Sequence, residues 1–340
     1  MTLETTEPSL QQWDDFVREQ PRAHILQRAN WGELKAAFGW RVVRVGLTYD
    51  DHLVAGAQIL LRSLPLGVAT MGYLPMGPYA PTDEALSALW DLIDQRMRAE
   101  NAAFLKWEPG IFEGGSPDLE RWGFRESSQT VQPPNTILLD VMEEDDEILS
   151  RMSQSTRRKV RLSWRKGVRY YEGTREDVDT FTQMMNTTGN RNDFGVHDPD
   201  YYRAAYDLFV PDGSAALILA EHEGDPLAGL MVFAGGRTAW YLYGASSNQK
   251  RNLMATYGVQ WEAIQWAKAR GMHAYDFWGI PDEDEDTLED QFKDRTDGLW
   301  GVYGFKRGWG GEVVRSAGAW DKVYNPLIYT AYRTALQFRE

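Results

Sequence analysis

The chain has 340 residues, a formal net charge of −14 and no cysteine. The missing cysteines exclude disulfides, thiol nucleophiles and thiolate metal ligands, and an aromatic content of 13% excludes a disordered chain. The length suffices for two domains of ordinary size. Residues 1–7 lack the apolar stretch of a signal peptide, and no run approaches the roughly 20 apolar residues that span a bilayer. We expect a cytoplasmic protein with no transmembrane segment, whose contact with any membrane is peripheral.

The first half of the chain predicts two neighbouring strands, a helix and a third strand. An apolar run follows 53–56, and a second strand is predicted at 71–77. Apolar residues at spacings of three and four then predict a helix between Leu86 and Met97. A short strand follows at 104–109. Because a helical crossover joins parallel strands, this last strand should run parallel to the one at 71–77.

The same order of elements returns in the second half of the chain. Strands are predicted at 227–233 and 240–245, a helix around 259–267 and a strand at 275–281. The simplest interpretation of this repetition is a duplicated domain of mixed α/β type.

An acidic break at 143–147 marks the predicted domain boundary, and it places acids where a helix N-terminus favours them. We expect domain 1 to cover 1–145 and domain 2 to cover 146–321. A C-terminal helix, 322–340, should pack back on domain 1, and Pro326 suits its first turn.

The turn before the second crossover helix, 246–255, bears on the choice of acyl donor. Strand, turn, long helix and strand form the cofactor-binding part of a GNAT acetyltransferase, where a glycine-rich turn holds the coenzyme A pyrophosphate at a helix N-terminus. This turn contains no glycine. We therefore expect α/β architecture with mixed sheets, as two tandem GNAT-like acyltransferase domains, without the coenzyme A site. The five histidines show no metal-ligand spacing, so no metal is expected. Without the coenzyme A site, no cofactor is expected either.

Five segments, taken in order, resemble the Fem (FemABX) peptidyltransferases, and the resemblance covers most of the chain. They are 24–40, 157–168, 241–247, 275–280 and 303–321, the last including Phe305-Lys306-Arg307-Gly308-Trp309. The resemblance implies transfer of an amino acid from aminoacyl-tRNA to the side-chain amine of the third stem-peptide residue. The acceptor would be UDP-MurNAc-pentapeptide or lipid II, in cell-wall cross-bridge synthesis. The chain is expected to act as a monomer, and no motif names the amino acid transferred.

The resemblance also assigns roles to particular residues. Lys306 is the main catalytic candidate, because a fixed cation beside the reacting ester stabilises the oxyanion. Glu108 stands where the family usually has Asp and could receive or hold a proton of the acceptor amine. Lys35 corresponds to a lysine that binds substrate phosphate.

The resemblance also suggests further candidate residues. Tyr257 could donate a hydrogen bond to the muropeptide, and Phe305 should shape the site. Arg191 and Tyr201 match a substrate-binding loop, in which His197 replaces a frequent arginine. A basic cluster could face tRNA and includes Arg157, Arg158, Lys159 and Arg161.

Two alternatives remain open from the sequence. One is a GNAT-like N-acyltransferase that uses acyl-coenzyme A or a protein N-terminus. The other is a non-catalytic protein that binds muropeptide or tRNA. The glycine-free turn speaks against the first, and only an activity measurement separates the second.

Overall fold

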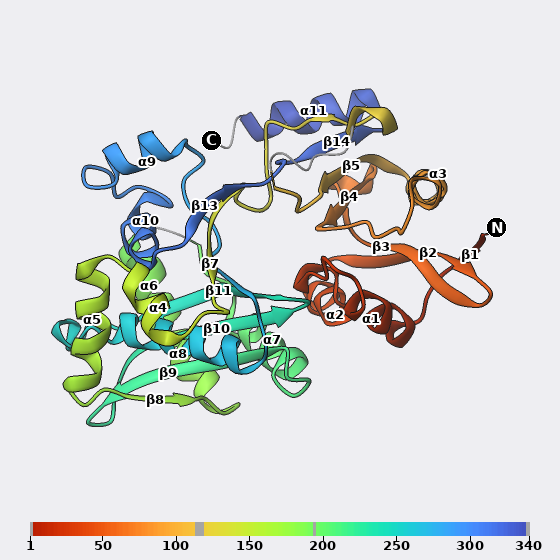
Figure 1. The fold of residues 1–340 in the computed structure, drawn as a ribbon. Helices are drawn as coiled ribbons and strands as arrows, with labels where there is room; N and C mark the ends of the chain where they lie inside the picture. Colours follow the sequence, from red (N-terminus) through yellow and green to blue (C-terminus); the bar gives the residue numbers. More distant parts are fainter. Residues whose placement is uncertain (1–2, 113–118, 193–194, 338–340) are drawn as a thin grey trace. The chain divides into compact units, whose positions relative to one another are not determined.

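The computed structural model describes residues 3–112, 119–192 and 195–337. The chain forms two compact units, Met1–Gln132 with Arg315–Glu340, and Pro133–Val314. Unit 2 is thus inserted in the chain between two parts of unit 1. Within the described residues, each unit is built around a mixed seven-stranded sheet (Figure 1).

The sheet of unit 1 has the strand order β1-β2-β3-β4-β5-β14-β6. Its strands are β1 Glu4–Thr6, β2 Arg41–Tyr49, β3 His52–Ser63, β4 Thr70–Pro75, β5 Ala102–Glu108, β6 Arg125–Glu126 and β14 Trp320–Val323. Its α-helices are α1 Leu10–Arg18, α2 Ala29–Ala37, α3 Asp83–Ala99 and α11 Pro326–Gln337. Short 3₁₀ helices lie at η1 Ile25–Gln27, η2 Pro65–Gly67 and η3 Leu119–Trp122.

The sheet of unit 2 has the strand order β13-β7-β12-β11-β10-β9-β8. Its strands are β7 Asn135–Asp140, β8 Arg169–Glu172, β9 Ala215–His222, β10 Asp225–Gly235, β11 Thr238–Ser246, β12 Ala274–Asp276 and β13 Glu312–Arg315. Its helices are α4 Asp145–Arg151, α5 Gln154–Arg165, α6 Asp177–Asn192, α7 Pro199–Phe209, α8 Ala255–Ala269, α9 Glu285–Gln291 and α10 Trp300–Lys306, with 3₁₀ turns η4 Arg251–Leu253 and η5 Arg307–Trp309.

Both predicted crossovers are present. In unit 1, α3 connects β4 to β5, and the two strands are parallel. In unit 2, α8 connects β11 to β12, and these strands are parallel as well. Strands β3 and β10 each pair antiparallel with the strand that follows, so the order meander, crossover and parallel strand occurs twice. The mixed α/β fold class is confirmed.

The helix α3 shows how local sequence produces these elements. The Thr82 hydroxyl accepts a hydrogen bond from the Ala85 N–H and caps the helix. Acidic residues occupy the first turn and Arg96 and Arg98 the last, which suits the helix macrodipole. Its apolar stripe, including Trp90, is buried against the sheet, where the Trp90 and Trp107 rings lie 4.7 Å apart between centroids.

The strand β5 separates two layers in unit 1, because its successive side chains point to opposite faces. Leu105 and Trp107 belong to the apolar cluster that contains α3. Phe104 faces the other way and contacts Tyr329 and Tyr332 of α11, at centroid distances of 5.1 and 4.9 Å. The helix α11 therefore covers the face of the sheet opposite to α3.

A buried ion pair links the C-terminal part of the chain to β5. The Lys106 ammonium donates to the Asp321 carboxylate of β14 at 2.8 Å, and these side chains are 4% and 5% exposed. The other carboxylate oxygen of Asp321 accepts from the Tyr329 hydroxyl at 2.8 Å. Lys106 also donates to Ser127 and to the Gln129 carbonyl. The pair therefore joins β5, β14, α11 and the segment before Gln132.

We expect Asp321→Ala to destabilise unit 1 by about 3–5 kcal/mol, because it leaves a buried ammonium without its counter-charge. Urea unfolding followed by circular dichroism and tryptophan fluorescence measures this change. The exposed pair Arg175–Asp207, with side chains 41% and 53% exposed, provides the matched control. Arg175→Ala should cost less than about 1 kcal/mol. Equal effects of the two substitutions would contradict a special role for the buried pair.

Candidate active site

Lys306, the last residue of α10, is buried, and only 6% of its surface is exposed. Its ammonium donates to the carbonyl oxygens of Trp278 and Gly279, at 2.9 and 2.7 Å. It also lies 5.7 Å from the centroid of the Tyr241 ring. Burial lowers the pKa of Lys306 to about 7, and the negative charge of Asp276 acts in the opposite direction. The amine therefore exists in both protonation states near neutral pH.

The turn that receives Lys306 follows directly on β12. The Asp276 carboxylate accepts hydrogen bonds from the Thr136 hydroxyl and, at 2.7 Å, from the Trp278 N–H. Trp278 has a φ of 57°, in the left-handed region that bulky residues rarely adopt. Burial raises the pKa of Asp276 to about 6, against the lowering effects of Thr136, Trp278 and Lys306. This carboxylate holds the strained turn whose carbonyl groups face the lysine.

The glycines around Lys306 bring the chain close to itself. A Cβ at Gly308 would lie 2.2 Å from the Thr156 hydroxyl oxygen of α5. Gly310 has a φ of 80°, and a Cβ there would lie 2.5 Å from the Arg151 carbonyl oxygen. The segment after Lys306 is therefore pressed against α4 and α5, and it begins with the 3₁₀ turn Arg307–Trp309. These glycines fix the position of α10.

Tyr257 and Phe305 form an aromatic cluster with Trp309. The Tyr257 ring lies 5.0 Å from Phe305 and stacks at 6.2 Å on Trp309, between centroids. The Tyr257 hydroxyl accepts a hydrogen bond from the Lys159 ammonium at 2.9 Å. This contact joins α5, which carries the basic cluster, to α8. Tyr257 and Phe305 are both half-buried.

The other basic residues of α5 differ in their environment. Arg157 donates to the carbonyl oxygens of Leu149 and Ser150 at 3.2 Å, and so satisfies the C-terminal end of α4. Arg158 and Arg161 are exposed. Of the four residues predicted to contact tRNA, Arg158 and Arg161 can therefore meet a nucleic acid without breaking the hydrogen bonds given for Arg157 and Lys159.

The residues Arg191, His197 and Tyr201 lie around the end of β11. The His197 ring stacks on Tyr201 with centroids 3.8 Å apart, and the Tyr201 hydroxyl lies 3.1 Å from that of Tyr243. Burial raises the pKa of Tyr201 well above its usual range, so its hydroxyl stays protonated. Arg191 donates to the Ser246 hydroxyl at 3.0 Å and to the Asn248 side chain at 2.9 Å.

Arg191 therefore binds the glycine-free turn 246–255. That turn contains Lys250 and Met254 in the left-handed conformation, with φ of 42° and 57°. Non-glycine residues in this conformation project side chains where a GNAT protein would offer bare backbone. The Ser246 and Asn248 side chains are thus engaged with α6, and every residue of the turn has a Cβ atom.

Glu108 closes β5 in unit 1 and is 4% exposed. Its carboxylate accepts hydrogen bonds from the Tyr73 hydroxyl and the Val131 N–H, both at 2.5 Å, and from the Gln132 N–H at 3.2 Å. Burial raises the pKa of Glu108, while these donors lower it. The carboxylate thus fixes the chain segment that leaves unit 1.

Lys35 is half-buried on α2, with its ammonium 4.7 Å from the centroid of the Trp31 ring. Burial lowers the pKa of Lys35 to about 8. A phosphate beside this amine would favour its charged form, because an anion within a few ångströms stabilises an ammonium.

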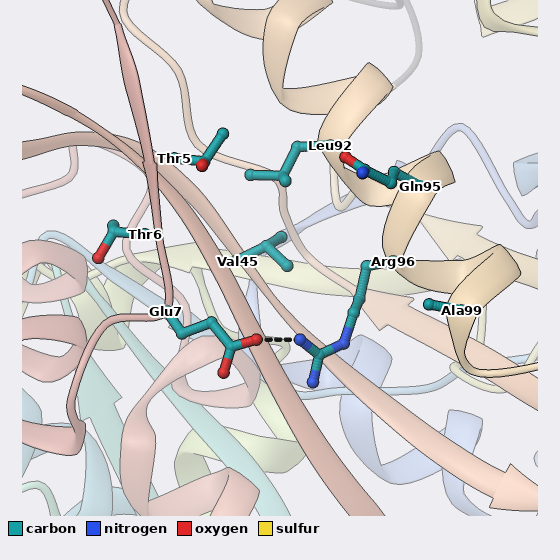
Figure 2. Close-up of a pocket in the computed structure, with 8 residues that line it drawn as sticks. All are labelled: Thr5, Thr6, Glu7, Val45, Leu92, Gln95, Arg96 and Ala99. Atoms are coloured by element: carbon teal, nitrogen blue, oxygen red, sulfur yellow. Dashed lines mark hydrogen bonds and ion pairs between the residues drawn. The ribbon is translucent and has the colours of Figure 1, made fainter.

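A separate hollow of about 320 Å³ lies in unit 1 between β1, β2 and α3 (Figure 2). An ion pair between Glu7 and Arg96 borders it. None of the predicted site residues lines this hollow. The described residues contain no cluster of three or more metal-ligating side chains. In the same ranges, no helix combines the length and the hydropathy needed to span a membrane.

The structure brings the predicted residues into several groups. In unit 2, Lys306 meets the β12 turn, Tyr257 meets Phe305 and Lys159, and His197 meets Tyr201. Lys35 and Glu108 belong to unit 1. Sequence reasoning missed Asp276. Its signal was an acid inside the apolar strand 275–280, because acids are rarely buried without a partner.

Comparisons with known proteins show the family of this chain. The model of the FemAB family matches residues 9–114, 122–225 and 219–337. The lipid II:glycine glycyltransferase of Staphylococcus aureus strain MRSA252 is 27% identical over 399 aligned residues, which cover 94% of this chain and 92% of the relative.

Solved structures agree with this match. The crystal structure of FemX superposes with a TM-score of 0.87 at 25% identity, over 96% of this chain and 99% of FemX. A tandem GNAT protein of clavulanic acid biosynthesis shares the fold, with a TM-score of 0.55 at 11% identity, over 96% of this chain and 99% of its own. Two GNAT-like halves and family matches along nearly the whole length make this chain a member of the FemAB family.

Proposed function

We propose that this chain is an aminoacyltransferase of cell-wall synthesis that moves an amino acid from aminoacyl-tRNA to a peptidoglycan precursor. The acceptor group is the side-chain amine of the third stem-peptide residue. Family membership supports transferase activity, and the Staphylococcus aureus relative is named for glycine transfer on lipid II. The aminoacyl-tRNA donor and the third-residue acceptor are the finer parts of the proposal.

The observation that carries the proposal is the buried amine of Lys306 at the β12 turn. An ammonium has three N–H bonds, and two of them point to the carbonyl oxygens of Trp278 and Gly279. The third can donate to a ligand. A cation held in a water-poor site stabilises a developing oxyanion far more than one in water, and it needs no reorganisation during the reaction.

The reaction balances without a cofactor. The neutral acceptor amine attacks the ester carbonyl carbon, and the carbonyl oxygen becomes an oxyanion beside Lys306. Collapse of this intermediate forms the amide bond and breaks the bond to the ribose oxygen. The proton lost by the attacking nitrogen ends on that oxygen, so tRNA leaves with a free hydroxyl. Because an ester already reacts with amines, positioning supplies much of the acceleration.

Other residues are proposed for binding. Lys35 and Arg191 supply positive charge for the phosphates of the precursor. The rings of His197, Tyr201 and Tyr257 offer stacking faces and polar tips for sugar or peptide, with Phe305 shaping the wall beside Tyr257.

Glu108 is proposed to act on the acceptor side through its hydrogen bond from Tyr73. Its three donors make it an organiser of that region, and we propose that Glu108 can hold the proton of the amine before the ribose oxygen receives it. For tRNA, we propose contact with the exposed Arg158 and Arg161, with Lys159 and Arg157 supporting the same helix.

A second candidate is acyl transfer from coenzyme A, which the GNAT-like fold allows. The turn 246–255 speaks against it, since its backbone carries side chains and Arg191 binds Ser246 and Asn248. Retention of coenzyme A by the purified protein would favour this candidate over the tRNA-dependent reaction.

Replacing Lys306 tests the proposal directly. The purified protein is mixed with charged tRNAs and UDP-MurNAc-pentapeptide or lipid II, and the mass of the precursor is measured by mass spectrometry. We expect a gain of one or more amino-acid residues, and a loss of about 10²–10³ in rate for Lys306→Met, as for removal of one oxyanion donor. Lys293→Met, which removes an exposed lysine of the same unit, should leave the rate unchanged. No mass gain with any charged tRNA and either acceptor would reject the proposed reaction.

The pH dependence of transfer should depend on Asp276. The ammonium form of Lys306 is lost as the pH rises through its pKa of about 7. Asp276→Asn removes the charge that raises this pKa, so the alkaline limb of the single-turnover rate should move to lower pH. Lys306→Arg, which stays charged, should abolish that limb. An unchanged limb in both variants would show that another group controls it.

The tRNA contact is tested by salt dependence. We expect Arg158→Gln and Arg161→Gln each to weaken tRNA binding and to lower the slope of log affinity against log salt by about 1. Fluorescence anisotropy with labelled tRNA gives both quantities. Arg175→Gln, an exposed arginine elsewhere in unit 2, is the control. Identical slopes in all variants would place the tRNA contact away from α5.

A further inference from the structure

The loop between β3 and β4 exposes apolar side chains at its tip. Leu66 is 100% exposed and Val68 is 53% exposed. Leu66 has a φ of 61°, a left-handed conformation that glycine adopts without strain and leucine does not. Folding gains nothing from a fully solvated leucine in this conformation. Such exposed apolar residues often mark a contact surface.

Leu327, in the first turn of α11, lies at the same edge of the sheet and is 84% exposed. β4 begins at Thr70, paired with Ala102 near the start of β5, and antiparallel β14 ends there, with Val323 opposite Phe104. The Asn101 amide donates to the Val68 carbonyl at 3.3 Å, and the Asn325 N–H donates to Ala103 at 2.9 Å.

Arginines surround these apolar side chains. β3 ends at Ser63, paired with Thr70 at the start of β4, so Arg62 lies at the same edge. Arg41 is also at this edge, at the start of β2, but its guanidinium pairs with the Glu100 carboxylate at 2.6 Å. The Arg62 guanidinium lies 5.4 Å from the Trp40 ring centroid. Arg98 lies 5.3 Å from the ring of Tyr324, just before α11. In a chain with a net charge of −14, a group of arginines beside exposed leucines is a local exception.

We infer that this edge docks on an anionic membrane surface. The edge consists of three apolar tips and two basic side chains, and we call it the membrane edge: Leu66, Val68, Leu327, Arg62 and Arg98. The apolar tips would enter the headgroup region while the guanidinium groups meet lipid phosphates, and stable attachment needs two such signals together. A second copy of the chain fits less well, because arginines would face arginines across a symmetric interface. The reason to approach a membrane rests on the proposed function, with a lipid-linked acceptor.

Vesicle co-sedimentation of the full chain tests this inference without any transfer assay. We expect binding to vesicles of phosphatidylglycerol with phosphatidylcholine at low salt, and little binding to phosphatidylcholine alone. Each arginine replaced by glutamine should weaken binding about fivefold. Leu66→Gly combined with Leu327→Glu should weaken it by about tenfold or more.

These two substitutions are chosen to preserve folding. Glycine relieves the left-handed conformation at position 66, and glutamate in the first turn of α11 suits the helix macrodipole. Leu10→Glu provides the matched control, because Leu10 is an exposed leucine of the same unit at the start of α1. α1 packs through Trp13 over Gly56, far along β3 from Ser63. The control should bind vesicles like the natural sequence.

Three outcomes would overturn the inference. These are no binding to anionic vesicles, binding unaffected by the paired leucine substitutions, or equal loss in Leu10→Glu. Sedimentation velocity without lipid covers the self-association alternative, since a dimer dissociated by the paired substitutions would assign the edge to a second copy. Transfer to the UDP-linked acceptor and to lipid II in detergent is measured separately, and the paired variant should retain the activity that the natural sequence shows. Failure of both reactions in all proteins would reject the proposed function and leave the vesicle result standing.

Discussion

The ammonium of Lys306 is held by two backbone carbonyl groups, and much of unit 2 is arranged around this contact. The carbonyls face the lysine because Trp278 adopts a left-handed conformation, which the Asp276 carboxylate stabilises by accepting its N–H. The lysine reaches them because Gly308 and Gly310 let the chain after α10 approach α5 and α4. A buried amine costs free energy in its charged form, and the lowered pKa of Lys306 expresses that cost. The fold thus maintains a group that water would otherwise keep fully protonated.

The repeated part of the fold could be predicted from the sequence because its signals are local. Apolar spacing identified α3 and α8, and the handedness and length of a helical crossover required parallel strands on either side. The partner beyond each crossover strand could not be predicted in the same way. β5 pairs with β14, more than two hundred residues later in the chain, whereas β12 pairs with the earlier strand β7. Both partners are short, and nothing in their own sequences distinguishes one antiparallel neighbour from another.

The candidate site shows a similar division. Lys306 was found through its resemblance to a family segment, in which several glycines follow the lysine. The structure places protein atoms in the space that two of those glycines leave, namely Thr156 and the Arg151 carbonyl. Asp276 lay within a segment quoted for the resemblance, yet its role depends on the φ of Trp278 and on Thr136 from another strand. Residue spacing does not reveal a backbone conformation or a long-range contact of this kind.

The two halves share one structural feature, a buried carboxylate, which has a different role in each. In each, the strand after the crossover helix ends in a buried carboxylate that accepts a hydroxyl and backbone N–H groups. Glu108 accepts from Tyr73 and from Val131 and Gln132, and so it anchors a connecting segment. Asp276 accepts from Thr136 and Trp278, and it also faces the charge of a buried lysine. The two carboxylates differ in register, because Glu108 lies opposite Pro75, the last residue of β4, whereas Asp276 lies opposite Trp240, the third residue of β11. In unit 2, the glycine-mediated packing of α10 brings the amine of Lys306 near the carboxylate, and the proposed oxyanion stabilisation rests on that amine.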